Sequence, residues 1–188
     1  MSKEQILVAA ASCFSERGYR GASIASIAER AGLSDAGLLH HFGSKAELYE
    51  AVISLRERSY SMAANIGPED SFPTLLEAII EGMRVSLESP DLLRFRAVLG
   101  GESLLSGHPA REHLEDVFHQ SVESIADRIH RDRESGLAKP GEDPRQIALE
   151  LLALNDGLRA QWALDSTMLD LTAVFARAAR ALLPRAGY

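Results

Sequence analysis

The residues with the clearest chemical pattern lie in residues 23–45, where short helical segments are capped by serine and broken by glycine. Ser23 and Ser34 each stand just before a run with helical spacing of apolar residues, so both are candidate N-caps. The free N–H groups and the positive dipole end of a helix N-terminus favour a phosphate. Lys45 adds a cation to the same region. The pattern predicts contacts with phosphate groups rather than covalent catalysis.

A helix-turn-helix is predicted for residues 23–42. Apolar residues at helical spacing indicate one short helix before Gly32 and a second between Ser34 and Gly43. A short turn containing glycine lets the second helix enter the major groove of DNA. Contacts to base edges are expected from the exposed start of that helix, which holds Asp35, Ala36, Gly37 and His40.

The order of residues around this turn resembles the TetR family of regulators. The segments SIASIAERAGLS and GLLHHFGSKAEL, which begin at Ser23 and Gly37, are similar to the family pattern T-x-x-x-I-A-x-x-A-G-[VL]-S-x-x-x-[LI]-Y-x-H-F-x-[SN]-K-x-x-L, and the resemblance covers residues 3–52. It implies phosphate contacts from Ser23, Ser34 and Lys45. It also implies that His41 lies at the DNA backbone or in packing and that Phe42 lies in the core.

Three positions depart from the family pattern. Leu39 stands where the family usually has a phosphate-contacting tyrosine, Gly37 where it often has serine or threonine, and Asp35 where a cation is commoner. Each half-site is therefore expected to bind modestly. A homodimer on a near-palindromic double-stranded operator, with half-sites roughly 34–36 Å apart, is then a functional requirement.

The charge distribution leaves the N-terminal part able to approach DNA. The formal net charge is −7, but residues 1–58 hold seven Lys or Arg and seven Asp or Glu, so the whole deficit lies in residues 59–188. The lone Cys13 cannot form an intramolecular disulfide, and no secretory leader or apolar run of membrane-spanning length is visible. A cytoplasmic protein without a membrane partner is expected.

The rest of the chain is also predicted to be helical. Helices are expected at Thr74–Glu88, Leu92–Leu105, Ala110–Glu134, Arg145–Leu164 and Met168–Leu183, with breaks at glycine and proline. The expected fold is all-α with about nine helices. Residues 1–50 would form a three-helix DNA-binding unit, and residues 51–188 a helical domain for ligand binding and dimerisation.

The last two long helices are predicted to form a dimer interface. The segment Ile147–Leu164 is apolar nearly all round, which indicates burial on more than one side, and the final helix is rich in alanine. The family resemblance implies an isologous four-helix interface from these helices. A two-sided core helix in a monomer is the alternative. The expected interface residues are Leu151, Leu154, Leu158, Val174, Phe175, Ala178 and Leu182.

The resemblance implies a ligand pocket in the middle helices, with apolar walls and a few polar groups. Simple core packing is the alternative for each residue, and Gly100-Gly101 suggests a break at an entrance. The candidates are Met83, Leu87, Phe95, Arg96, Leu99, Phe118, His119, Val122, Asn155 and Trp162.

Other function classes fit less well. The stretch Gly101–Leu105 lacks the closing glycine of a nucleophile elbow, and Cys13 on an apolar helix face is a packing residue. His113, Asp116 and His119 are poorly aligned for a metal, and no cofactor motif is present. The sequence predicts a ligand-responsive transcriptional regulator, a repressor released by a small molecule, and not an enzyme. A helical adaptor that binds protein instead of DNA is the alternative.

Overall fold

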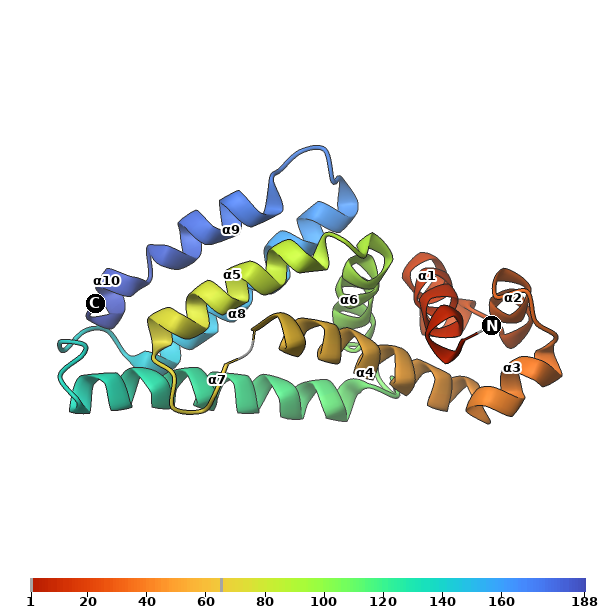
Figure 1. Ribbon diagram of the computed structural model, residues 1–188, viewed down its shortest axis with the longest axis horizontal. Helices are drawn as coiled ribbons and strands as arrows, with labels where there is room; N and C mark the ends of the chain where they lie inside the picture. The colour runs from red at the N-terminus through yellow and green to blue at the C-terminus, as the bar shows by residue number, and fades with distance from the viewer. Residues whose placement is uncertain (1, 65) are drawn as a thin grey trace. The chain divides into compact units, whose positions relative to one another are not determined.

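The computed structural model describes residues 2–64 and 66–188, with the side chains of residues 59–64 left out. Within these residues all regular structure is helical and no strand occurs, which confirms the expected all-α class. Ten helical segments follow one another along the described chain (Figure 1): α1 (Lys3–Gly21), α2 (Ile24–Arg30), α3 (Asp35–Phe42), α4 (Lys45–Ala64), α5 (Phe72–Ser86), α6 (Pro90–Glu102), α7 (Arg111–Glu134), α8 (Pro144–Leu164), α9 (Leu171–Arg180) and α10 (Leu183–Ala186).

The chain divides into two compact units. The first unit comprises residues 1–60 and 86–111, and the second comprises residues 61–85 and 112–188. This division differs from the expected one at residue 50, because α6 packs on α1 and so belongs to the first unit. Helical periodicity identifies α6 but carries no information about its packing partner.

The core of the first unit is built on α1. The apolar face of this helix is buried, with Ile6, Ala10 and Phe14 each 0% exposed. The Phe14 ring meets the Tyr49 ring edge-on at 4.7 Å between centroids, and Tyr49 meets Phe95 of α6 in the same way at 5.5 Å. Edge-to-face aromatic contacts add to the hydrophobic burial that joins α1, α4 and α6.

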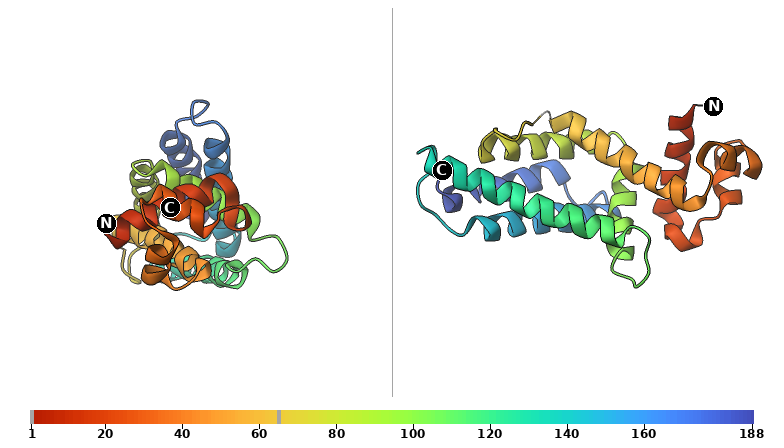
Figure 2. Two further views of the ribbon diagram at one scale, coloured as in Figure 1. Left: turned by 90° about the vertical axis from the view of Figure 1, so that its right-hand side faces the viewer. Right: turned by 90° about the horizontal axis from the view of Figure 1, so that it is seen from below.

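The second unit is formed by α5, α7, α8 and α9, and α8 packs against α9. The longest of the described helices is α7, which Figure 2 shows from two further sides. Apolar side chains buried on these helices provide the hydrophobic stabilisation of the unit: Phe72, Leu76, Ile125, Ile129, Ile147, Leu151, Leu171 and Phe175.

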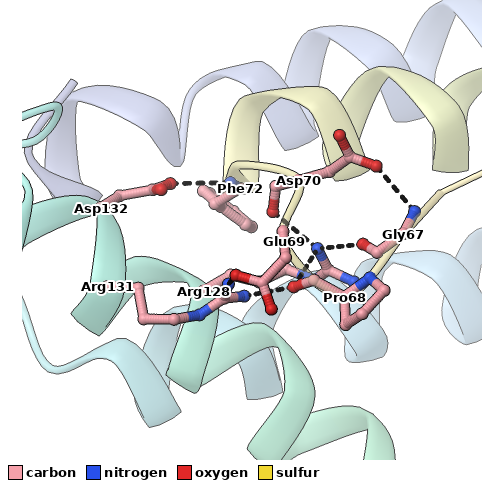
Figure 3. A network of polar contacts seen from close by, with 8 residues as sticks. All are labelled: Gly67, Pro68, Glu69, Asp70, Phe72, Arg128, Arg131 and Asp132. Atoms are coloured by element: carbon pink, nitrogen blue, oxygen red, sulfur yellow. Dashed lines mark hydrogen bonds and ion pairs between the residues drawn. The ribbon is translucent and has the colours of Figure 1, made fainter.

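A polar network fixes the loop between α4 and α5 to α7 (Figure 3). Arg128 is buried, and its Nη1 donates to the carbonyls of Gly67 at 2.9 Å and Asp70 at 2.6 Å. Asp132, one turn further on, accepts the backbone N–H of Phe72 at 2.8 Å and the hydroxyl of Tyr188. The network provides hydrogen-bond partners for the backbone carbonyls of Gly67 and Asp70 and for the N–H of Phe72.

None of the described helices combines the length and the hydropathy that a membrane span requires.

Candidate nucleic-acid interface

The helix-turn-helix forms as predicted, and its serine caps explain where its helices begin. The Oγ of Ser23 accepts the backbone N–H of Ser26 at 3.1 Å, and the Oγ of Ser34 accepts that of Gly37 at 3.1 Å. Gly32 in the turn has φ 65°, a left-handed conformation that glycine adopts without strain. The two serine caps and the glycine turn together set the direction of α3 relative to α2.

Helix α3 buries one face and leaves the other open. Leu38 is 0% exposed and Phe42 5% exposed, so both anchor α3 in the first unit. The open face carries the predicted contact residues Asp35, Ala36, His40 and His41, all exposed, with Gly37 half-buried. An exposed helix with a polar, imidazole-bearing face can offer side chains to base edges and phosphates.

Lys45 lies at the start of α4 and reaches back to the end of α1. Its Nζ donates to the carbonyl of Ala22 at 2.9 Å and lies 4.5 Å from the centroid of the Tyr19 ring. The predicted phosphate ligand therefore also has a positioning role that the sequence pattern did not indicate. The cation holds the start of α4 to the end of α1.

Helix α2 is tied to α1 by a charged contact. Arg30 donates to both carboxylate oxygens of Glu16, at 2.6 and 2.8 Å, and to the hydroxyl of Ser12 at 2.6 Å. The hydrogen bonds from Arg30 hold the pKa of the Glu16 carboxyl below its ordinary value. Cys13 is buried, as expected of a packing residue, and burial raises the pKa of its thiol.

A partly buried polar cluster at the end of α6 was not found by sequence reasoning. The Glu102 carboxylate accepts the backbone N–H of Tyr19 at 2.8 Å and lies 3.8 Å from Nε2 of His108. That Nε2 is 3.5 Å from the Tyr49 hydroxyl, and burial is the main cause that lowers the pKa of His108. No local motif marks these residues, because they meet only through the packing of α6 on α1.

The ten predicted pocket residues do not all lie in one unit. Leu87, Phe95, Arg96 and Leu99 belong to the first unit, where Phe95 and Leu99 are core residues. Phe118 and His119 are exposed on α7, Phe118 to 46%. These two and the remaining four belong to the second unit. Of the four, Met83 is 0% exposed and Val122 and Trp162 are each 8% exposed, while Asn155 is half-buried.

One further residue of the second unit was missed, although it broke the apolar pattern of α8. Arg159 is 1% exposed, and its Nε donates to Sδ of Met83 at 3.5 Å. It lies one turn after Asn155, so both side chains share a face of α8. The sequence did contain a signal: a charged residue within an apolar stripe, four residues after Asn155 and three before Trp162.

The predicted dimer residues need a correction. Leu151, Phe175 and Leu182 are at most 3% exposed within the subunit, so they have no surface left to bury against a partner. Leu154, Leu158, Val174 and Ala178 are half-buried. The exposed apolar stripe of α8 instead consists of Leu149, Ala153, Gly157, Ala160 and Leu164, which follow one another at helical spacing.

Comparisons with known proteins agree with this reading of the N-terminal unit. Residues 6–52 match the family described as bacterial regulatory proteins, tetR family. The transcriptional repressor AcnR of Corynebacterium glutamicum is 31% identical over 138 residues, which cover 72% of this chain and 68% of the relative. AcnR of Corynebacterium efficiens is 29% identical over 178 residues, covering 92% and 88%.

Solved structures show the same fold over nearly all of the chain. The SmeT–triclosan complex superposes with a TM-score of 0.76 at 20% identity, covering 96% of this chain and 89% of that one. SmeT is the repressor of the Stenotrophomonas maltophilia multidrug efflux pump SmeDEF. The helix-turn-helix geometry, the family match and the identity to AcnR together identify the chain as a member of the TetR family of DNA-binding transcriptional regulators.

Proposed function

We propose that this regulator represses transcription in the cytoplasm as a homodimer on a near-palindromic operator, and that a small molecule bound in its helical body releases it. The proposal rests mainly on the open face of α3. His40 and His41 are exposed on this face, whereas Leu38 and Phe42 are buried on the other. A helix anchored on one side and polar on the other can enter a major groove without unfolding.

The DNA contacts divide into two kinds. Ser23 and Ser34 lie at helix N-termini, where N–H groups and the helix dipole favour phosphates, and Lys45 supplies a cation beside them. Asp35, Ala36, Gly37 and His40 face the bases. Phosphate contacts supply affinity and register, whereas base contacts supply sequence selectivity.

A dimer places two copies of α3 on one operator. The stripe of α8 that begins at Leu149 and ends at Leu164 exposes these two leucines to 45% and 89%, with small residues between them. Small side chains allow two helices to approach closely, and the same stripe on a second copy is self-complementary about a twofold axis. The half-buried Val174 and Ala178 of α9 flank it.

Release by a ligand follows from differential affinity. The dimer can adopt a form in which the two copies of α3 are not spaced to match the two operator half-sites. A molecule that binds this form more tightly shifts the protein toward it. SmeT, which shares the fold, is known as a complex with triclosan, and AcnR is named as a repressor. The adaptor alternative, a helical protein that binds protein instead of DNA, finds no support among these relatives.

The α3 assignment is tested by a matched pair of histidine substitutions. A binding site is first selected from a randomised DNA library, and its affinity is measured by fluorescence anisotropy. His40→Ala is expected to weaken selective binding about tenfold, since a lost base contact costs roughly 1–3 kcal/mol. His130→Ala, on the exposed surface of α7, is the control and should bind like wild type. Equal affinities for all three proteins would overturn the assignment of α3 as the reading helix.

A further inference from the structure

Leu39 is a large apolar residue on the part of α3 that is open to solvent. It is 38% exposed, whereas Leu38 beside it is 0% exposed and Phe42 is 5% exposed. Leu38 and Phe42 attach α3 to the core of the first unit. The exposed part of Leu39 is left to contact another molecule.

Ala36 extends this apolar surface. Ala36 and Leu39 are three residues apart on one helix, so their Cβ atoms are neighbours at about 5–6 Å. Ala36 is exposed, and so is Asp35, which stands four residues before Leu39. Ala36 and Leu39 therefore form a small apolar pair among the residues that are proposed to face the bases.

The pair is held in place at both ends of α3. At the start, Oγ of Ser34 accepts the backbone N–H of Gly37 at 3.1 Å. At the end, the carbonyl of Leu39 accepts the N–H of Gly43 at 2.7 Å, and Gly43 has φ 67°. A short helix that is capped and anchored in this way has little freedom to lose when its exposed side chains meet a partner.

The chemistry of leucine limits what Leu39 can contact on DNA. Its side chain has no hydrogen-bond donor for a phosphate oxygen and no group that can pair with a polar base edge. The apolar group that base edges present in the major groove is the C5-methyl of thymine, and apolar side chains pack against it. Such a contact removes two apolar surfaces from water, whereas a leucine against a phosphate would desolvate the charge without compensation.

We infer that Leu39, together with Ala36, reads the C5-methyl group of a thymine in each operator half-site. This contact makes α3 distinguish thymine from uracil, which differs from it by that methyl group alone. Leu39 is then a specificity-determining residue. The inference rests on the proposed function, in which α3 reads the operator, and adds the kind of base that this residue selects.

Removal of single methyl groups from the DNA tests the contact. The operator selected from the randomised library is made with each thymine replaced in turn by deoxyuridine, in both half-sites at once. The replacement removes the methyl group and keeps every hydrogen-bonding group of the base. In fluorescence anisotropy, one pair of replacements is expected to weaken binding of the wild-type protein about tenfold, which corresponds to roughly 0.8 kcal/mol of methyl burial in each half-site.

Two variants and one control assign this preference to Leu39. Leu39→Ala should bind the thymine and deoxyuridine operators equally, and Leu39→Met, which keeps a long apolar side chain, should retain the preference. Leu137→Ala shortens a leucine of the second unit that is 58% exposed, and it should also retain the preference. Circular dichroism checks that each variant is folded.

Four outcomes would overturn the inference. They are a selected operator with no thymine in its half-sites, deoxyuridine replacements that all leave the affinity unchanged, a thymine preference that Leu39→Ala retains, and a preference that Leu39→Met or Leu137→Ala also loses. If the protein binds the selected operator but gives one of these results, only the inference fails. If the library yields no selectively bound operator, the proposed function fails.

Discussion

The carboxylate of Glu102, the last residue of α6, accepts the backbone N–H of Tyr19 at 2.8 Å. Gly18 has φ 67° and ψ 177°, which breaks α1 just before Tyr19. At such a break a backbone N–H loses its place in the helical hydrogen-bond ladder and needs another acceptor. Glu102 provides one, so α6 and α1 are joined by a polar contact as well as by apolar packing.

Gly18→Ala is expected to destabilise the protein by about 1–3 kcal/mol. A Cβ at Gly18 would lie 2.0 Å from Oε1 of Glu102, and the positive φ is unfavourable for alanine. Gly101→Ala is the control, because its Cβ would meet nothing within 4 Å and alanine favours a helix. Urea denaturation followed by circular dichroism measures both. Equal loss of stability in the two variants would show that the Gly18–Glu102 contact does not matter.

Protonation of His108 is expected to destabilise the protein in acid. Its Nδ1 accepts the N–H of Ala110 at 3.3 Å, so the buried ring is neutral, and burial lowers its pKa. The unfolded chain, with a histidine pKa of about 6.5, then binds more protons than the folded one. The stabilisation is therefore complete above that pH and is lost as the pH falls below it.

The pH dependence is measured by urea denaturation between pH 7 and pH 5. His108→Gln should be less stable than wild type at pH 7 and should lose less stability on acidification. His119→Gln, on the exposed surface of α7, is the control and should follow the wild-type curve. An unchanged pH slope in His108→Gln would contradict the assignment of the slope to this residue.

Arg128→Met is expected to destabilise the protein by roughly 1–3 kcal/mol, because it leaves loop carbonyls without a donor. Arg131→Met is the control on the same helix. Its Nη1 pairs with Glu69, whose side chain is 89% exposed, and its Nη2 donates to the carbonyl of Pro68, which Arg128 also reaches. Exposed contacts of this kind contribute little. Thermal unfolding compares the two. A loss for Arg131→Met as large as that for Arg128→Met would contradict the importance of burial in the network of Figure 3.

Gly157→Arg is expected to convert the protein to a monomer. A Cβ at Gly157 meets no atom within 4 Å, so the subunit tolerates a side chain that would block close approach of a second α8. Ser124→Arg, on the exposed surface of α7, adds the same charge elsewhere and should leave the dimer intact. Sedimentation velocity distinguishes the two states. If the Gly157→Arg protein remained dimeric, the interface would lie away from the exposed stripe of α8 between Leu149 and Leu164.

The helix-turn-helix could be predicted because its determinants are local. Ser23 and Ser34 cap the helices that directly follow them, and Gly32 sits in the turn that it makes possible. Ser44 acts in the same way at the start of α4, where its Oγ accepts the Glu47 N–H at 3.1 Å. Caps and turns depend on neighbours within a few residues, so a single sequence reveals them.

The outward face of α8 could not be predicted, for the opposite reason. The helix is apolar nearly all round, so its pattern gives no preferred side, and Leu151 could not be distinguished from Leu149. Only tertiary packing buries the first and exposes the second. The contacts of Lys45 with Ala22 and of Glu102 with Tyr19 also join residues that no sequence motif links.

The central claim, that this chain is a sequence-selective DNA-binding regulator, is tested most directly by fluorescence anisotropy across a salt series. The protein is titrated against DNA from just upstream of its own gene and against a randomised operator library, with scrambled DNA as the control. The account predicts tight, selective binding that weakens steeply as salt rises, because phosphate contacts release counterions. Absence of selective binding to both DNA sources at low salt would contradict it.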